Sequence, residues 1–292
     1  MSFILFKISK ILVLLFNTKD PQKGDALIGY KQTLPGAIPR TVHDKLGEFI
    51  SVKDFGAKGD GQTDDTNAIQ TAINSFNQNG WAVFVPPGKY MVTGTLHIPS
   101  HLRLLGANES SCWLIKPPGS SGSLLSVAHQ SDVYISDLSI EYGESPQPGS
   151  VCLYIAEGSK EILVERCFCK GGYYPILIAG SDQNPVRYVT LRDVEGSYGP
   201  IGWGIEVHHA ENISFYNCKA RWNALDGLKL SQKTFHVLVE GGHYDYNGSN
   251  HPKFKYSGDG IDIAQGGDRV TIRGCETVNE TVSHNDVTNT TN

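Results

Sequence analysis

The sequence predicts an all-β protein, a parallel β-helix whose chain winds as a solenoid behind one short N-terminal capping helix. Three observations support this fold class. Glycine accounts for 32 of the 292 residues, against a usual share of about 7%. A helical pattern of apolar residues is clear at only one place, near residue 70. Pairs of alternating apolar residues then return every 24–33 residues.

The composition excludes several other classes of protein. Apolar residues make up 39% of the chain and charged residues 19%, so it is too apolar to be disordered and long enough to bury a large core. The formal net charge is −5 and no stretch is strongly basic, which argues against nucleic acid as a partner. The six cysteines form no Cys-x-x-Cys motif, so neither a zinc ribbon nor a thioredoxin-like site is supported.

We expect residues 1–25 to be an apolar leader and linker outside the fold. Residues 1–16 are apolar and carry Lys7 and Lys10, as a signal peptide does, but no small-residue cleavage site follows. The uninterrupted apolar run at 11–16 is too short to span a bilayer. We therefore predict no stable membrane insertion, and secretion stays open as an alternative.

The segment that follows predicts a cap for the solenoid. Residues 41–48 form a short helical piece, 50–55 a first strand, and Asp64, Asp65 and Thr66 can cap a helix that ends at 79–80. Its apolar residues recur at helical spacing: Ala68, Ile69, Ala72, Ile73 and Phe76. Residues 82–85, followed by Pro-Pro-Gly, predict a buried strand that ends in a turn.

A repeat organises the rest of the chain. Two apolar pairs occur in each unit, and the differences in unit length fall in the turns. One pair begins at Val133, Ile162, Val189, Ile213, Val237 and Val270, and the other at Leu125, Leu153, Ile176, Ile205, Leu228 and Ile261. Strands of this kind stack about 4.8 Å apart and form apolar ladders. Three cysteines, Cys167, Cys218 and Cys275, then lie at inward positions, where we expect small hydrophobic side chains and neither disulfides nor metal ligands.

The N-terminal third resembles a known family. The stretches FISVKDFGAKGDGQTDDTNAIQTAIN and VFVPPGKYMVTGTLHIPSHLRLLGAN are similar to the start of the pectate-lyase-like (rhamnogalacturonase/epimerase-like) β-helix domain of bacteriophage tailspike and capsule depolymerase proteins. The preceding ALIGYKQTLPGAIPRTVHDKLGEF resembles a tailspike neck. The resemblance implies a right-handed, single-stranded β-helix at 49–275, a neck at 26–48 and a polar tail at 276–292.

The same resemblance implies function and setting. It points to a polysaccharide-degrading tailspike or depolymerase, an enzyme of the glycoside hydrolase or polysaccharide lyase type that cleaves a bacterial surface glycan. It also implies attachment to a phage tail, a location on the virion tail or the host's outer surface, and a homotrimer if the chain is full-length. The matching motifs build the cap, however, so we expect Asp54, Asp60, Asp64 and Asp65 to be turn and helix-cap residues.

A candidate site lies on the outward face of the last coils. Outward positions of successive coils should stack as a column of Glu206, Lys229 and Asp262 beside Gly204, Gly227 and Gly260, which would leave a shallow floor. The surrounding turns add carboxylates and candidate substrate-binding residues: Asp226, Asp259, Trp203 and His208, with His251 and Tyr256 in the insertion at 247–258.

Spacing assigns chemistry to these carboxylates. Glu206 and Asp262, two coils apart, should lie about 9–10 Å apart, near the range of about 6.5–9.5 Å for inverting glycosidases. Asp226 and Asp259, one coil apart, should raise one carboxyl pKa by repulsion, whereas Lys229 should keep its neighbours ionised. We therefore predict Asp226, Asp259 and Asp262 as the reacting group and Glu206 as a helper, and Asp259-x-x-Asp262 is also similar to a cluster in tailspike endoglycosidases.

Several alternatives stay open at this point. Lys229 could neutralise an acidic sugar while His208 or His251 takes a proton, as a lyase requires. The same fold could serve as a glycan- or receptor-binding module without turnover, or as a truncated prophage remnant, since the tail at 276–292 is polar and lacks an apolar cap. We expect no required cofactor, and no loop has the spacing of a metal site, although Asp259 and Asp262 could offer oxygen ligands to Ca²⁺.

Overall fold

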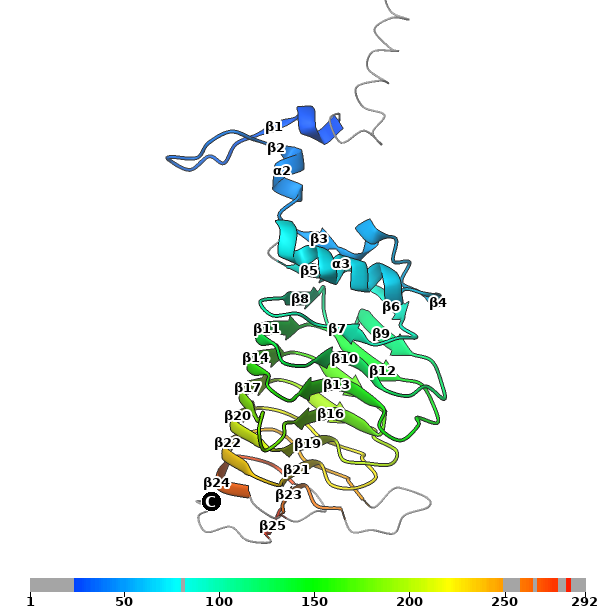
Figure 1. Cartoon of the computed structure of the whole chain (residues 1–292), viewed down its shortest axis with the longest axis vertical. Helices are drawn as coiled ribbons and strands as arrows, with labels where there is room; N and C mark the ends of the chain where they lie inside the picture. The colour runs from blue at the N-terminus through cyan, green and yellow to red at the C-terminus, as the bar shows by residue number, and fades with distance from the viewer. Residues whose placement is uncertain (1–23, 80–81, 249–257, 265–266, 278–281, 285–292) are drawn as a thin grey trace, which may run out of the picture.

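The computed structural model describes residues 24–79, 82–248, 258–264, 267–277 and 282–284. A narrow N-terminal neck leads into a solenoid of stacked coils that runs along the long axis of the molecule (Figure 1). Apart from short helices near the N-terminus, the described elements are strands. The predicted class, an all-β parallel β-helix behind one capping helix, is confirmed.

Three parallel sheets build the solenoid, and successive coils add one strand to each sheet as far as β18; beyond it, sheet 3 continues as isolated bridges through Lys219, His243 and Glu276. Sheet 1 contains β7 (Leu96–His97), β10 (Ser123–Val127), β13 (Val151–Ala156), β16 (Tyr174–Ala179), β19 (Ile205–His208), β21 (Leu228–Ser231), β23 (Ile261–Ile263) and β25 (Val282–His284). Sheet 2 contains β3 (Ile50–Ser51), β5 (Val83–Val85), β8 (Arg103–Gly106), β11 (Ser131–Ser136), β14 (Lys160–Glu165), β17 (Val186–Arg192), β20 (Ala210–Tyr216), β22 (Thr234–Glu240) and β24 (Gly267–Arg273). Sheet 3 contains β4 (Asp60–Asp64), β6 (Gly88–Met91), β9 (Cys112–Lys116), β12 (Ser139–Tyr142), β15 (Phe168–Lys170) and β18 (Glu195–Ser197).

The core consists of the predicted apolar ladders. Val133, Ile162 and Val189 pair in register on consecutive strands of sheet 2 and are buried. Burying a Val or Ile side chain contributes about 1.5–3 kcal/mol, so each ladder adds stability coil by coil. The six cysteines are free thiols; Cys167 and Cys218 are buried and Cys275 is half-buried. The prediction that Cys167 and Cys218 lie at inward, buried positions is confirmed, and Cys275 is less buried at the equivalent place.

The N-terminal cap differs from the sequence prediction in one element. Residues 50–55 do not form one strand: β3 ends at Ser51 and a 3₁₀ helix, η2 (Val52–Phe55), follows. The break occurs because Ser51 and Asp54 form a reciprocal capping box. The helix α3 (Thr66–Asn79) lies across the end of the solenoid (Figure 1), where it covers an otherwise open end.

The cap aspartates hold turns together, as predicted. Asp65 is buried and accepts hydrogen bonds from the backbone N–H groups of Lys58 and Gly59 at 2.6 and 2.9 Å. Asp64 accepts from the N–H of Thr66 at 3.0 Å, at the start of α3. Hydrogen bonds such as these hold the pKa of Asp64 at about 2, against the effect of its partial burial.

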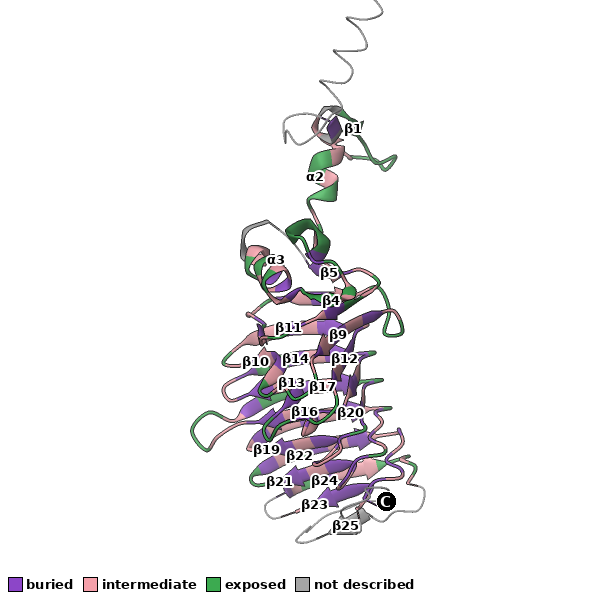
Figure 2. Ribbon diagram, turned by 90° about the vertical axis from the view of Figure 1, so that its right-hand side faces the viewer, coloured by how far each residue is buried: buried purple, intermediate pink, exposed green. Residues whose placement is uncertain are grey.

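The neck carries little core of its own. It contains a 3₁₀ helix, η1 (Gly24–Leu27), two short antiparallel strands, β1 (Gly29–Tyr30) and β2 (Arg40–Thr41), and α2 (Val42–Leu46), where the sequence predicts a helical piece. No residue of α2 is buried (Figure 2). Large apolar side chains are exposed along it: Ile28, Leu34, Ile38, Leu46 and Phe49. Among the described residues, no helix is long and apolar enough to cross a membrane.

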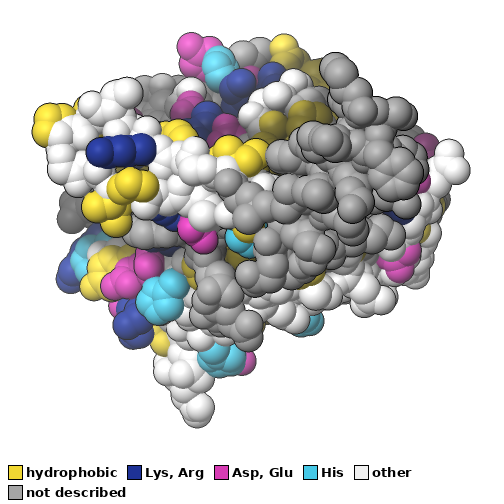
Figure 3. All heavy atoms as spheres, turned by 90° about the horizontal axis from the view of Figure 1, so that it is seen from above, with side chains coloured by type: hydrophobic (Ala, Val, Ile, Leu, Met, Phe, Trp, Pro, Cys, Tyr) yellow, Lys and Arg dark blue, Asp and Glu magenta, His cyan; other side chains and the backbone are white. Residues whose placement is uncertain are grey.

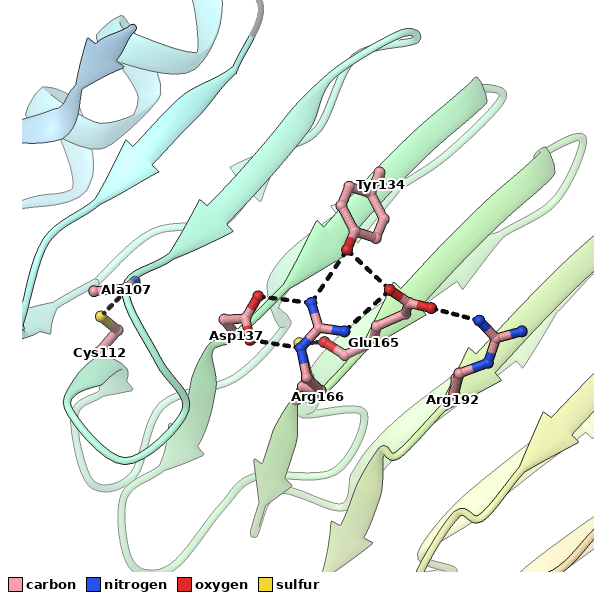
Figure 4. Close-up of polar contacts among 8 residues, drawn as sticks. Ala107, Cys112, Tyr134, Asp137, Glu165, Arg166 and Arg192 are labelled. Carbon is pink, nitrogen blue, oxygen red and sulfur yellow. Dashed lines mark hydrogen bonds and ion pairs between the residues drawn. The ribbon is translucent and has the colours of Figure 1, made fainter.

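A polar network ties the coils together at the corner between sheets 2 and 3 (Figure 4). Arg166 donates to both carboxylate oxygens of Asp137 on the preceding coil, at 2.7 and 2.9 Å. Glu165 accepts from Tyr134 and from Arg192, each at 2.9 Å. The arginines are substantially exposed, so each ion pair contributes at most about 1 kcal/mol. We interpret the network as structural.

Candidate functional site

The predicted column of outward side chains is present on sheet 1. Glu206 on β19 pairs in register with Lys229 on β21, and Lys229 pairs with Asp262 on β23. The apolar residues on either side of each are buried, which fixes the direction of the column. Asp262 is 7% exposed, whereas Glu206 and Lys229 are half-buried.

Lys229 is the electrostatic centre of this site. Its ammonium group forms an ion pair with Asp262 and lies 3.7 Å from Oδ2 of Asp226. It also lies 5.8 Å from the centre of the Trp203 ring, a distance at which a cation still interacts with an aromatic face. One lysine therefore faces two aspartates and the neighbouring Glu206.

Asp226 is held by hydrogen bonds from two other predicted residues. Trp203 donates through Nε1 to Oδ2 at 2.9 Å, and the backbone N–H of Asp259 donates to Oδ1 at 2.9 Å. Burial raises the pKa of Asp226 above its ordinary value, and Asp262 adds to the rise, while Lys229 and these hydrogen bonds oppose it. The sequence prediction was wrong about the source of the repulsion: it comes from Asp262, whereas Asp259 contributes a stabilising backbone N–H.

Glu206 differs from the prediction most. Burial raises the pKa of Glu206 to about 7, although Lys229 acts to lower it. The prediction that Lys229 keeps this carboxyl ionised is wrong, because the loss of hydration outweighs the attraction of a lysine already paired with aspartates. No hydrogen bond joins its side chain to another described residue. Glu206 therefore offers a carboxyl that holds its proton near neutral pH.

The three glycines do not form an exposed floor. Gly204, Gly227 and Gly260 are buried. A Cβ on Gly204 would lie 2.4 Å from Nδ2 of Asn223, and one on Gly227 would lie 2.7 Å from Nδ2 of Asn247. The alternation of inward and outward side chains holds within a strand but not in the turn before it. Alternation would place these glycines on the outside, but they face inward. The glycines make room for two buried asparagines of successive coils, which hydrogen-bond to each other at 2.9 Å.

An aromatic contact that the sequence did not predict completes this side of the site. The ring of Tyr174, at the start of β16, stacks on that of Trp203 with 5.8 Å between centres and 10° between planes. Tyr174 and Lys229 belong to the coils on either side of Trp203. The predicted role of Trp203 as a sugar-stacking residue therefore competes with a positioning role, since the indole contacts Tyr174, Asp226 and Lys229.

His208 lies on the same outward face as Glu206, two residues further along β19. It is half-buried, and its Nδ1 lies 3.1 Å from Nδ1 of His209. Burial first, and then His209, lower the pKa of His208, which favours the neutral imidazole. His251 and Tyr256, predicted as substrate-binding residues, lie outside the described residues.

The described part of the chain contains no group of three or more His, Cys, Asp or Glu side chains placed to hold a metal ion. Viewed along the long axis, acidic, basic and histidine side chains lie intermixed at the visible rim (Figure 3). Within the described residues the site is acidic, because Asp226 and Asp262 both face Lys229. Such a site can give and take protons but would repel an anionic group.

Comparison with known proteins supports the β-helix fold and shows which proteins this chain is similar to. A family model described as "Right handed beta helix region" matches residues 123–292, and one described as "Rhamnogalacturonase A/epimerase, pectate lyase-like" matches residues 49–131. The chain is 41% identical over 121 residues to the tail spike protein of Shigella phage Sf6, covering 39% of this chain and 19% of that protein. It is 28% identical over 284 residues to the pre-neck appendage protein of Bacillus phage phi29, covering 84% of this chain and 31% of that protein.

The fold is also similar to a solved structure, the N-terminal fragment of the phage phi29 gene product 12. The TM-score is 0.65 at 22% identity, over 82% of this chain and 43% of that one. The chain thus spans about a third or less of the length of the curated relatives named above. These findings confirm the predicted resemblance to the pectate-lyase-like β-helix of phage tailspikes.

Proposed function

The chain belongs to the right-handed β-helix family, and from this premise we propose that it cleaves glycosidic bonds of a bacterial surface polysaccharide. The observation that carries the proposal is the column of Glu206, Lys229 and Asp262 on sheet 1, in which burial raises the pKa of Glu206 to about 7 while Asp262 pairs with the ammonium group of Lys229. Glycoside hydrolysis uses two carboxyl groups in different surroundings, one of which has a raised pKa and acts as the acid.

In the proposed reaction, Glu206 acts as the general acid. It transfers its proton to the glycosidic oxygen as the bond from the anomeric carbon to that oxygen breaks. Asp262 takes a proton from the water whose oxygen attacks the anomeric carbon. Two coils of about 4.8 Å separate the backbones of these residues, with Lys229 on the coil between them; a separation of about 10 Å is nearer to the inverting range of about 6.5–9.5 Å than to the retaining one of about 5–5.5 Å. This reverses the roles expected from the sequence, in which Glu206 was only a helper.

The other residues of the site have supporting roles in this proposal. Lys229 holds Asp262 and Asp226 in place, and Trp203 and the backbone of Asp259 fix the Asp226 carboxylate. Asp226 and Asp259 are then positioning residues and not reacting groups. The arrangement explains why one lysine lies among three carboxyl groups: without it, their mutual repulsion would be uncompensated in a partly dry site.

The charge balance favours hydrolysis over β-elimination. Elimination acts on an acidic sugar, whose carboxylate must be neutralised in the site. Lys229, the cation that the described residues place in this cluster, is already paired with Asp262 and close to Asp226. A neutral sugar at the cleavage position meets no such repulsion. Elimination would instead use the neutral imidazole of His208 as base, which makes the two reactions distinguishable by experiment.

The test is cleavage of purified bacterial capsular polysaccharides by the full chain, followed by new reducing ends and by ultraviolet absorbance of unsaturated sugars. The proposal predicts reducing ends without absorbance, lost in Glu206→Gln and Asp262→Asn. Glu240→Gln, on sheet 2 away from the column, is the matched control and should retain activity. Absorbance that depends on His208 would overturn hydrolysis in favour of elimination. Glycan binding without either signal would overturn the enzyme and leave a binding module.

We further propose that the protein acts on a phage tail as a homotrimer. The names of the Sf6 and phi29 relatives support the location, and the exposed apolar side chains of the neck, such as Ile38 and Leu46, support association. Sedimentation equilibrium of the full chain should give three times the monomer mass. A monomer at micromolar concentration would contradict this proposal.

A further inference from the structure

Three consecutive coils place an aromatic residue at the same point, directly after the strand position of sheet 3. These residues are Tyr198, Trp222 and Tyr246, each 24 residues from the next. The N–H of Tyr198 donates to the carbonyl of Arg221, and that of Trp222 donates to Asp245. The three positions therefore stack along the solenoid axis. We call them the aromatic ridge.

The backbone at these positions does not favour aromatic side chains. Tyr198, Trp222 and Tyr246 have φ angles of 60°, 60° and 56°, in the left-handed region that glycine adopts most easily. The preceding coil has Gly171 at the equivalent point, with φ of 76°. Folding would therefore be served better by glycine. Left-handed φ angles at non-glycine residues recur at other turns of this solenoid, such as Arg166 and Tyr188; what distinguishes the ridge is that an aromatic residue takes this position on three consecutive coils.

The rings are exposed yet held in fixed orientations. Tyr198 is 47% exposed and Trp222 is 38% exposed. Trp222 stacks on Tyr246 with 4.4 Å between ring centres and 7° between planes, and Tyr198 packs edge-on against Phe168 at 6.5 Å. Rings ordered in this way lose little entropy on binding a ligand.

A groove begins at Tyr198, the first residue of the ridge. Its volume is about 680 Å³, and Tyr198 and Pro200 line it together with Tyr142 and the ion pair of Lys170 with Glu141. This size is in the range of ligand sites, about 300–1,000 Å³. The groove thus combines aromatic surface with charged groups that can exchange hydrogen bonds with hydroxyls. The turn from Tyr198 through Pro200 leads directly to Trp203 at the acidic column.

We propose that the aromatic ridge and its groove form an accessory saccharide-binding surface, which holds a stretch of the polysaccharide away from the acidic column. The ligand class rests on the proposed function. Sugar rings present C–H faces that pack on aromatic rings, and hydroxyls that pair with groups such as Lys170 and Glu141. Continuity through one turn lets a single polymer chain contact both places.

The test uses glycine substitutions, because glycine relieves the backbone while it removes the ring. Trp222→Gly and Tyr246→Gly are made singly and together in the full chain. The matched control is Tyr188→Gly, since Tyr188 is also exposed, also has a left-handed φ of 55°, and lies on sheet 2. Binding to each purified bacterial capsular polysaccharide is measured by affinity gel electrophoresis, and melting temperature is measured alongside it.

The expected result is that the double variant binds the retained polysaccharide more weakly, by roughly tenfold or more, with an unchanged or higher melting temperature. Tyr188→Gly should bind as the wild type does. Wild-type affinity in the ridge variants, or no retardation of the wild-type chain by any polysaccharide, would overturn the proposal. Weaker binding accompanied by a lower melting temperature would also overturn it, by showing that the rings are structural.

The two proposals can fail separately. If no polysaccharide is cleaved but the ridge variants lose binding, then hydrolysis fails and the accessory surface stands. If cleavage occurs and the ridge variants bind and cleave a long polymer as the wild type does, then the accessory surface alone is wrong.

Discussion

Replacing Glu206 by glutamine should change stability in a pH-dependent way, which tests the electrostatics of the site without any substrate. Burial raises the pKa of Glu206 from about 4.5 to about 7. The folded state therefore binds this proton more tightly than the unfolded state does. By linkage, the stability that the protonated group provides is fully present below about pH 4.5 and is lost as the pH rises toward 7.

The magnitude follows from the shift. One pKa unit corresponds to about 1.4 kcal/mol, so the ionised carboxyl costs at most about 3 kcal/mol of folding free energy at pH 8. Glutamine has nearly the same shape and carries no charge. The variant should therefore match the wild type within about 1 kcal/mol at pH 4.5, and exceed its stability by about 1–3 kcal/mol at pH 8.

The assay is urea unfolding of the full chain at pH 4.5, 6 and 8, followed by circular dichroism. Glu240→Gln is the control, because Glu240 lies in an exposed ion pair with Arg273 on sheet 2, and its effect should vary little above pH 6. A Glu206→Gln variant whose difference from the wild type is the same at all three pH values would refute the reasoning. It would mean that Glu206 titrates in the folded protein as it does in the unfolded chain.

Two further predictions concern the surroundings of this group. Lys229→Met should leave Asp226 and Asp262 without their cation, so we expect stability to fall by about 2–4 kcal/mol at pH 8. Burial already raises the pKa of Asp226, so the loss should be smaller at pH 5. Urea midpoints at both pH values check this, and an equal loss would contradict it. Asn223→Ala removes a buried side chain that bonds to Asn247, Gly199 and Gly196, so we expect a loss of about 1–3 kcal/mol, measured in the same way. Asn184→Ala is the control, because Asn184 lies in an exposed turn, and it should change the urea midpoint little. A loss of stability as large as that of Asn223→Ala would contradict a particular contribution from the buried Asn223–Asn247 pair.

The fold and the column were predictable because both depend on short periods. Alternation of inward and outward residues is strict within a strand, so once Ile205, Leu228 and Ile261 are assigned inward, their neighbours Glu206, Lys229 and Asp262 must face outward in register. The apolar ladders follow from the same rule. Both predictions need no knowledge of the turns.

The errors all lie where the chain leaves the strands. Gly204 and Gly227 precede strands, and their direction is set by the buried Asn223 and Asn247 and not by alternation. The pKa of Glu206 depends on how far the surrounding turns exclude water, which the sequence does not encode locally. One signal was available: Asn223 and Asn247 are separated by 24 residues, as are the ridge residues, and a search for identical or similar residues at the coil period would have found both ladders.

If Glu206 and Asp262 hydrolyse a glycan, the new reducing ends released from a capsular polysaccharide should show inversion at the anomeric carbon. We expect no unsaturated product, and a loss of cleavage by about 10²-fold or more in Glu206→Gln. Cleavage that persists at the wild-type rate in Glu206→Gln and Asp262→Asn, both folded, would contradict it.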